Sequence, residues 1–124
     1  TIPHYNYTDL NGKQTNVEVI VGQISEKKAP PPPPNSWAFD PNHEVAIWNI
    51  RMEAGAKWKL PKASAGLNRK VYFYEGKELL IDGQQIPFYH SVEVDFDADL
   101  LLESGSDISN ILLLQGKPIG EAVV

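Results

Sequence analysis

The residues best suited to hold a metal ion are three histidines, and they lie far apart in the sequence. They are His4, His43 and His90, and no two of them form a His-x-His pair. A metal site built on strands uses such a pair because residues two apart project from the same face of a strand, with a carboxylate supplied by a neighbouring strand. We therefore expect these histidines to be turn and surface residues.

Two other stretches match the sequence motifs of a calcium-binding loop and of a nucleophile elbow only in part. Residues 95–99 (DFDAD) resemble the opening of a calcium-binding loop, but the required glycine is Leu100 and the final glutamate is Ser106. Residues 62–66 (KASAG) lack the first glycine of a nucleophile elbow. Neither stretch predicts a calcium ligand or a catalytic serine.

Carboxylates and aromatic side chains supply the remaining candidates. Glu75 and Asp82 could pair across a hairpin, although acid–base catalysis would need burial that separates their pKa values. Four aromatic residues could line a cavity for a planar ligand, but such residues more often fill a core, and we favour packing. They are Trp48, Trp58, Tyr72 and Tyr74, of which Trp58 should be partly exposed because lysines flank it.

The composition narrows the functional classes. The 124 residues are 42% hydrophobic and 22% charged, as in an ordinary globular domain. A net charge of -5 argues against a nucleic-acid surface. The absence of cysteine excludes disulfides and thiolate sites and favours a reducing cytoplasm, and no apolar run reaches the roughly 20 residues of a membrane span.

Period-two alternation and turn signals predict an all-β domain. Asn11-Gly12 and Asp82-Gly83 are strong turn signals, whereas residues 1–10 look irregular. No stretch has a convincing helical period, so we expect a single sandwich or jelly-roll β-barrel. The expected strands and hairpin cover residues 17–21, 44–52, 70–75, 79–86, 92–96, 100–102 and 111–114.

A proline-rich stretch, Ala29–Asn35, contains five consecutive prolines. Proline cannot donate to a sheet ladder, so we expect a polyproline II loop. A stiff connection between strands is the favoured interpretation. The alternative is a docking site for a protein partner of the SH3 or WW type.

Several phrases, in order along the chain, resemble one known family. They are residues 32–38 (PPPNSWA), 44–48 (EVAIW), 67–69 (LNR), 72–76 (YFYEG), 81–83 (IDG) and 112–121 (LLLQGKPIGE). Together they resemble the carboxy-terminal cupin domain of pirin-like proteins, which are bicupins. The resemblance implies one cupin domain over residues 1–124, with a linker and first strand up to about Asn16, ending before the family's C-terminal segment.

The resemblance also implies where chemistry would lie. Pirin-like proteins hold iron or another divalent metal in their first domain through three histidines and a glutamate; some are quercetin dioxygenases, and mammalian members are nuclear co-regulators. Where the cupin pattern places ligands, this chain has residues 58–61 (WKLP), 68–70 (NRK) and 100–103 (LLLE). We therefore expect no metal, cofactor or catalytic residue here.

The resulting hypothesis is a non-catalytic structural and interaction half of a bicupin. Its expected partners are an N-terminal cupin domain absent from this chain, or a second copy bound through the exposed interdomain surface. One alternative is that the chain forms part of a metal-dependent quercetin 2,3-dioxygenase-like enzyme. Another is a partner-binding module or transcriptional co-regulator.

Overall fold

The computed structural model describes residues 2–24, 27–31, 34–36, 44–63, 67–86, 90–94 and 99–117, and these ranges contain strands and turns but no helix. The strands are β1 (His4–Thr8), β2 (Gln14–Val21), β3 (Gln23–Ile24), β4 (Lys27–Lys28), β5 (Ala46–Met52), β6 (Lys57–Leu60), β7 (Asn68–Glu75), β8 (Leu79–Ile81), β9 (Gln84–Gln85), β10 (Ser91–Glu93), β11 (Leu100–Ser104) and β12 (Ser109–Gly116).

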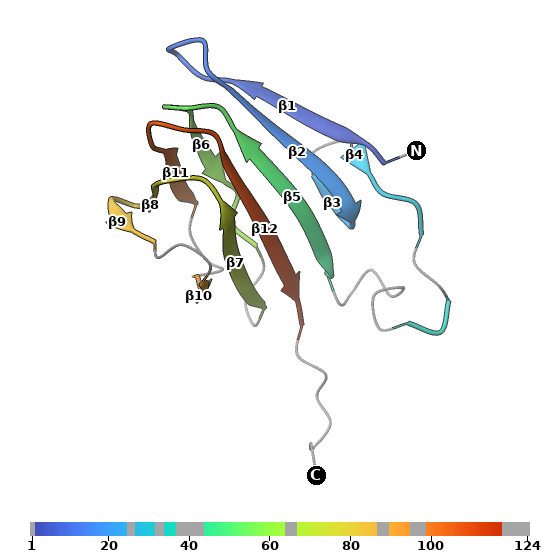
Figure 1. Ribbon diagram of the computed structural model, residues 1–124. Coiled ribbons are helices and arrows are strands. Elements are labelled where there is room, and N and C mark those ends of the chain that lie inside the picture. Colours follow the sequence, from blue (N-terminus) through green and yellow to red (C-terminus); the bar gives the residue numbers. More distant parts are fainter. Residues whose placement is uncertain are drawn as a thin grey trace.

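The strands form two main antiparallel sheets. A six-stranded sheet has the order β1-β2-β5-β12-β7-β10, and a four-stranded sheet has the order β6-β11-β8-β9. Figure 1 shows the larger sheet in front, with β6, β8 and β11 behind it. The two sheets enclose the core, so the expected all-β jelly-roll architecture is confirmed.

The inner faces of both sheets are apolar because the strands alternate at period two. Val17 and Val19 on β2, and Val71 and Phe73 on β7, are fully buried. Alternation predicts that Val17 and Val19 share one face of their strand and that Val71 and Phe73 share one face of theirs, and these are the buried faces. The core also contains Trp48, Ile50, Met52, Leu60, Leu79, Leu102, Ile111 and Leu113.

Two of the connections between strands contain a glycine with a positive φ. The β7–β8 connection passes through Gly76, whose φ is 135°, a value that side chains disfavour. The predicted Asp82-Gly83 turn joins β8 to β9 with φ of 50° and 82°, as a type I′ turn requires.

Two expectations about local structure were wrong. Residues 4–8 form strand β1, which pairs with β2, although the first ten residues looked irregular. Strand β6 was also missed, because its lysines and the following Pro61 masked the alternation of Trp58 and Leu60.

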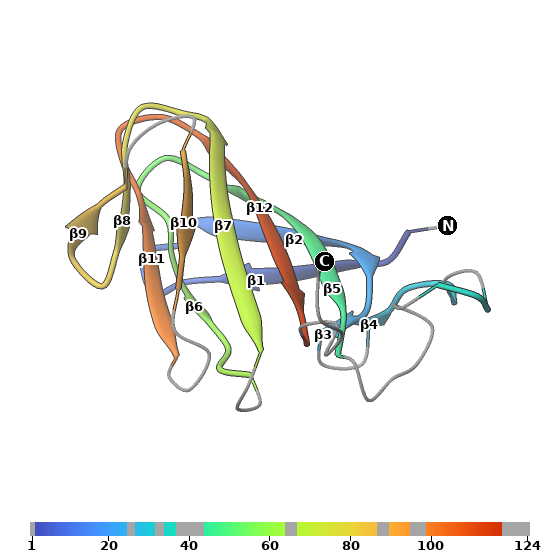
Figure 2. The ribbon, with the colours of Figure 1, turned by 90° about the horizontal axis from the view of Figure 1, so that it is seen from below.

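The proline-rich stretch is described only in part. Ala29 is buried and its amide donates to the Gly22 carbonyl, while Pro30, Pro31 and Pro34 are exposed. Figure 2 shows this segment at the opposite end of the molecule from the β8–β9 hairpin. Pro32 and Pro33 lie outside the described residues, so the polyproline II conformation and the protein-docking role stay predictions.

Candidate functional site: a groove between the two sheets

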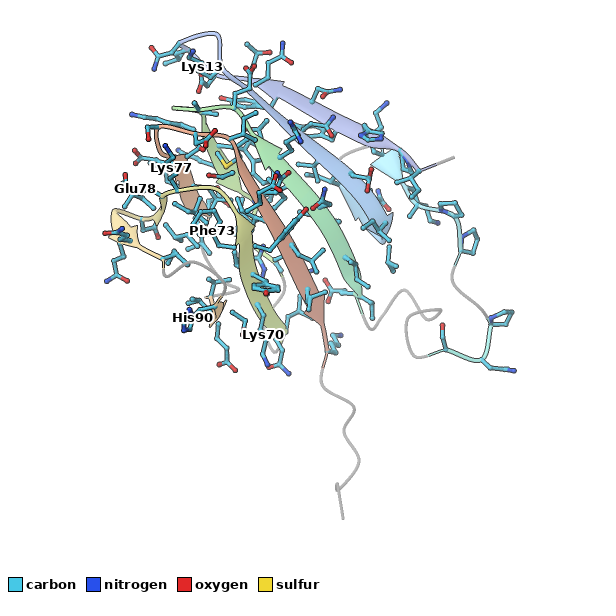
Figure 3. The ribbon with its side chains drawn as sticks, in the orientation of Figure 1. Lys13, Lys70, Phe73, Lys77, Glu78 and His90 are labelled. Carbon is cyan, nitrogen blue, oxygen red and sulfur yellow. The ribbon has the colours of Figure 1, made fainter. Side chains whose placement is uncertain are left out.

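The described residues contain no group of three or more His, Asp or Glu side chains that could hold a metal ion. His4 lies on β1 and His90 immediately precedes β10, and these strands are the two opposite edges of the six-stranded sheet. Figure 3 shows His90 beside β10, below Phe73. These two histidines therefore cannot share a metal, and His43 lies outside the described residues.

Arg69 belongs to the stretch 68–70, where the resemblance leads us to expect a carboxylate ligand in a metal-binding cupin. It is on the inner face of β7 with Val71 and Phe73, and only 2% of it is exposed. Its Nη2 donates to the Pro61 carbonyl oxygen at 2.9 Å. Burial lowers the pKa of Arg69, and the nearby Asp99 carboxylate opposes that shift. A buried guanidinium repels a metal cation, so this end of the barrel does not fit a bound metal.

The carboxylates singled out in the sequence accept hydrogen bonds at separate places, Glu75 from a side chain and the two aspartates from backbone amides. Glu75 Oε1 accepts from Asn110 Nδ2 at 2.6 Å, and Asp82 Oδ1 accepts from the Leu101 amide at 2.8 Å. Asp99 Oδ1 accepts from the Lys62 amide at 2.8 Å. The candidate stretches at residues 95–98 and 64–66 lie outside the described residues.

The four candidate aromatic residues do not line one cavity. Trp48 and Trp58 are on the inner faces and are 5% and 4% exposed, so the expectation that Trp58 is partly exposed was wrong. Alternation on β7 places Tyr72 and Tyr74 on the opposite face of the sheet from the core, so the favoured expectation that they fill the core was wrong for these two residues. Burial raises the pKa of Tyr74, although its hydroxyl donates to Asn49 Oδ1, which acts in the opposite direction.

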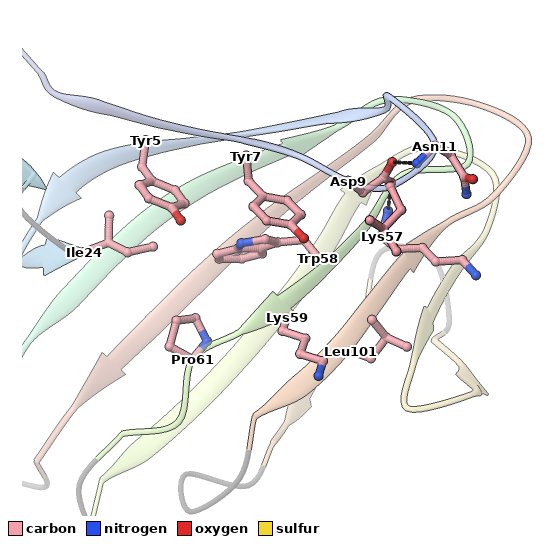
Figure 4. A pocket seen from close by; sticks show the side chains of 11 residues that line it. Tyr5, Tyr7, Asp9, Asn11, Ile24, Lys57, Trp58, Lys59, Pro61 and Leu101 are labelled. Carbon is pink, nitrogen blue, oxygen red and sulfur yellow. Dashed lines mark hydrogen bonds between the residues drawn. The ribbon is translucent and has the colours of Figure 1, made fainter.

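A hollow lies where the two sheets separate. Strand β1 is an edge of the six-stranded sheet and β6 is an edge of the four-stranded sheet, and neither pairs with the other. The hollow between them, here called the β1–β6 groove, has a volume of about 760 Å³. Figure 4 shows the rings of Tyr5 and Tyr7 directed from β1 toward Trp58. The other lining residues are Asp9, Leu10, Asn11, Ile24, Lys57, Lys59, Pro61 and Leu101.

Asp9 closes one end of this groove. Its Oδ1 accepts from the amides of Asn11 and Lys13 at 2.9 and 3.0 Å, and its Oδ2 accepts from the Lys57 amide at 2.9 Å. The Lys57 hydrogen bond is the main reason that the pKa of Asp9 lies below its ordinary value. The carboxylate thereby ties the β1–β2 turn to the free edge of β6.

Trp48 lies beside a second, smaller hollow. This hollow has a volume of about 440 Å³ and shares Ile24 and Pro61 with the β1–β6 groove. The Trp48 Nε1–H is buried and has no hydrogen-bond partner among the described residues. It is therefore a donor available to an acceptor that enters this region.

Few features of the sequence predict the groove. Tyr5, Tyr7 and Asp9 were not candidates, although two tyrosines separated by one residue could have indicated a strand with an aromatic face. The 48-residue separation between Asp9 and Lys57 explains why their contact could not be predicted.

An apolar patch covers part of the outer face of the six-stranded sheet. Ile20 and Leu114 are 37% and 41% exposed, and Leu112 is partly exposed. The register places Leu114 opposite Ile47 and Leu112 opposite Tyr72. The outward face of an antiparallel sheet is usually polar. We call these five residues the outer-sheet patch.

Comparisons with known proteins identify the fold. No protein-family model and no curated protein sequence matches the chain. A crystal structure of quercetin 2,3-dioxygenase from Acinetobacter baumannii is similar over 99% of this chain and 38% of its own, with 18% identity and a TM-score of 0.74. A predicted oxalate decarboxylase from Thermotoga maritima matches over 94% of each chain, with 13% identity and a TM-score of 0.59.

A third similar structure is the Cupin_2 domain of an XRE-family transcriptional regulator from Enterobacter cloacae. It covers 84% of this chain and 97% of its own, with 16% identity and a TM-score of 0.58. These similarities show that the chain has the cupin fold. This chain spans little more than a third of the quercetin 2,3-dioxygenase chain.

The described part of the chain has no helix long and apolar enough to cross a membrane.

Proposed function

We propose that this chain is the non-catalytic, metal-free cupin domain of a pirin-like two-domain protein and acts as its structural and interaction half. The observation that carries the proposal is the outer-sheet patch, which exposes Ile20 and Leu114 on a face that would be polar in an isolated domain. A second domain that covers the patch would remove these side chains from water.

The similarity to larger proteins supports this proposal. The quercetin 2,3-dioxygenase structure has a TM-score of 0.74, and the GK1651 structure from Geobacillus kaustophilus has a TM-score of 0.67. Both alignments include nearly the whole of this chain. They include only 38% of the quercetin 2,3-dioxygenase chain and 45% of the GK1651 chain. The Cupin_2 domain and the predicted oxalate decarboxylase, which the chain nearly spans, have lower scores of 0.58 and 0.59. The two highest scores thus belong to chains that extend well beyond the matched part, as expected for one half of a longer protein, although two other chains matched over 51% of their length score only 0.56 and 0.53.

The packing of the barrel interior supports a non-catalytic role for this half. Trp58 and Leu60 fill the core after Gly55, and the buried Arg69 occupies one end of the barrel. If the whole protein is a quercetinase-like enzyme, its metal would then belong to the other half, while this half stabilises and orients that domain.

The test is the association state of the purified chain, measured by size-exclusion chromatography with light scattering over a range of concentrations. With no second domain to cover the outer-sheet patch, we expect the mass to rise toward a dimer as concentration increases. Leu114→Glu should leave a monomer, because it replaces an exposed apolar side chain of the patch, next to Ile47, with a charge.

Leu10→Glu is the matched control. Among the residues that the structure describes, Leu10 is the most exposed large hydrophobic one, but it lies in the β1–β2 turn, away from the patch. It should associate like the unaltered chain. A chain that is monomeric at every concentration, or that is equally affected by both substitutions, would refute the interaction role.

A further inference from the structure

We propose that the β1–β6 groove is a binding site for a planar aromatic carboxylate. The ring would lie among Tyr5, Tyr7 and Trp58, and the carboxylate would lie at the Lys59 end of the β6 edge (Figure 4). This inference does not depend on a second domain.

The size and lining of the groove suit a small molecule. Its volume of about 760 Å³ lies within the range of roughly 300–1,000 Å³ that is usual for small-molecule pockets. Three aromatic rings and the side chains of Ile24 and Pro61 supply apolar contact. Aromatic rings pack favourably against other rings in offset or edge-to-face arrangements. The walls therefore favour a planar aromatic group.

The charges of the groove favour an anion. Lys57 and Lys59 are exposed at its rim, and the remaining charged lining residue, Asp9, has both carboxylate oxygens engaged by backbone amides. The groove thus has a local excess of positive charge in a chain whose net charge is -5. A ligand carboxylate would gain a charge-assisted hydrogen bond from a lysine ammonium group.

The edge of β6 already binds one carboxylate. The Lys57 amide donates to Asp9 Oδ2, so this amide points away from the neighbouring strand β11. Amides two residues apart on a strand point in the same direction, so the Lys59 amide faces the groove about 7 Å further along. A ligand carboxylate at Lys59 would repeat the contact that Asp9 makes at Lys57, with the Lys59 ammonium group beside it.

The adjoining hollow provides a further polar contact. It continues past Ile24 and Pro61 to Trp48, whose buried Nε1–H has no acceptor among the described residues. An oxygen substituent at the far end of a long aromatic ligand could accept this hydrogen bond.

The experiment titrates the full chain with 2-naphthoate by calorimetry and by two-dimensional amide NMR, with neutral 2-naphthamide as the matched ligand. We expect 2-naphthoate to bind with a Kd of about 1 mM or tighter. We expect 2-naphthamide to bind about tenfold more weakly, because it lacks the charge. The Lys59 amide and the Trp58 indole resonances should shift.

Two lysine variants separate the groove from general surface charge. Lys59→Met should abolish the preference for 2-naphthoate, whereas Lys77→Met should retain it, because Lys77 is exposed in the β7–β8 connection, away from the groove (Figure 3). Tyr7→Ala, on the edge strand β1, should weaken both ligands. Equal affinity for the two ligands, no measurable binding, or shifts confined to the outer-sheet patch would overturn the proposal.

Discussion

Gly76 offers the sharpest test of the way in which the two sheets are joined. A Cβ atom added at this position would lie 2.8 Å from the carbonyl oxygen of Ile108 and 2.8 Å from Cε1 of Phe73. The first contact is with the backbone and the second is with a fully buried ring. Neither neighbour can move without disturbing the β11–β12 connection or the core.

The expected cost of Gly76→Ala has two parts. A non-glycine residue at a positive φ costs about 1–2 kcal/mol, and forcing a methyl group into an occupied site costs about 1–3 kcal/mol more. Gly55→Ala is the matched control, because Gly55 also has a positive φ, of 75°, but a Cβ there would meet nothing within 4 Å. The free energy of unfolding of the Gly55→Ala control should therefore fall only by the cost of the positive φ, about 1–2 kcal/mol.

The assay is urea unfolding of both variants, followed by circular dichroism and tryptophan fluorescence. If the m-value is unchanged, the difference in midpoint gives the difference in free energy of unfolding. A chain of 124 residues should also melt about 4 °C lower for each kcal/mol lost. Equal destabilisation by Gly76→Ala and Gly55→Ala would refute the close approach of the two inter-sheet connections.

Two further predictions concern titratable side chains. Because the folded-state pKa of Asp9 lies below 3.8, its stabilising hydrogen bonds are present above pH 3.8 and are lost as the pH falls through the folded value. The protection of the Lys57 amide from hydrogen exchange, relative to the unfolded chain at the same pH, should therefore fall in that acidic range and in Asp9→Asn at neutral pH, and unchanged protection would contradict the contact. Because burial raises the pKa of Tyr74 above 10.0, its stabilising effect is full below pH 10.0 and is lost as the pH rises through the folded value. Ultraviolet titration should therefore show a tyrosine transition above 10.0 that disappears in Tyr74→Phe, and persistence of that transition would contradict the assignment.

Much of the fold could be predicted because the strands follow simple patterns. On β5, Ala46, Trp48, Ile50 and Met52 alternate with less buried residues, as the sequence indicates. The Asp82-Gly83 turn could be predicted for a similar reason, since both of its residues need a positive φ. These features depend only on neighbouring residues.

The groove could not be predicted because it depends on pairing between distant strands. Its walls come from β1 and β6, which are free edges of different sheets, and no local pattern identifies an edge strand. The expectation for Trp58 failed for a different, local reason. The lysines on either side are exposed, but the period of two turns Trp58 into the core between them.

The central claim is that this cupin domain fills its barrel with apolar side chains and Arg69 in place of a metal site. The most direct test is to strip the purified chain with a chelator, incubate it separately with Fe²⁺, Ni²⁺, Mn²⁺, Cu²⁺ and Zn²⁺, dialyse it and measure its metal content. We predict substoichiometric metal in every case. One tightly held metal ion per chain would contradict the account and would restore a catalytic role to this domain.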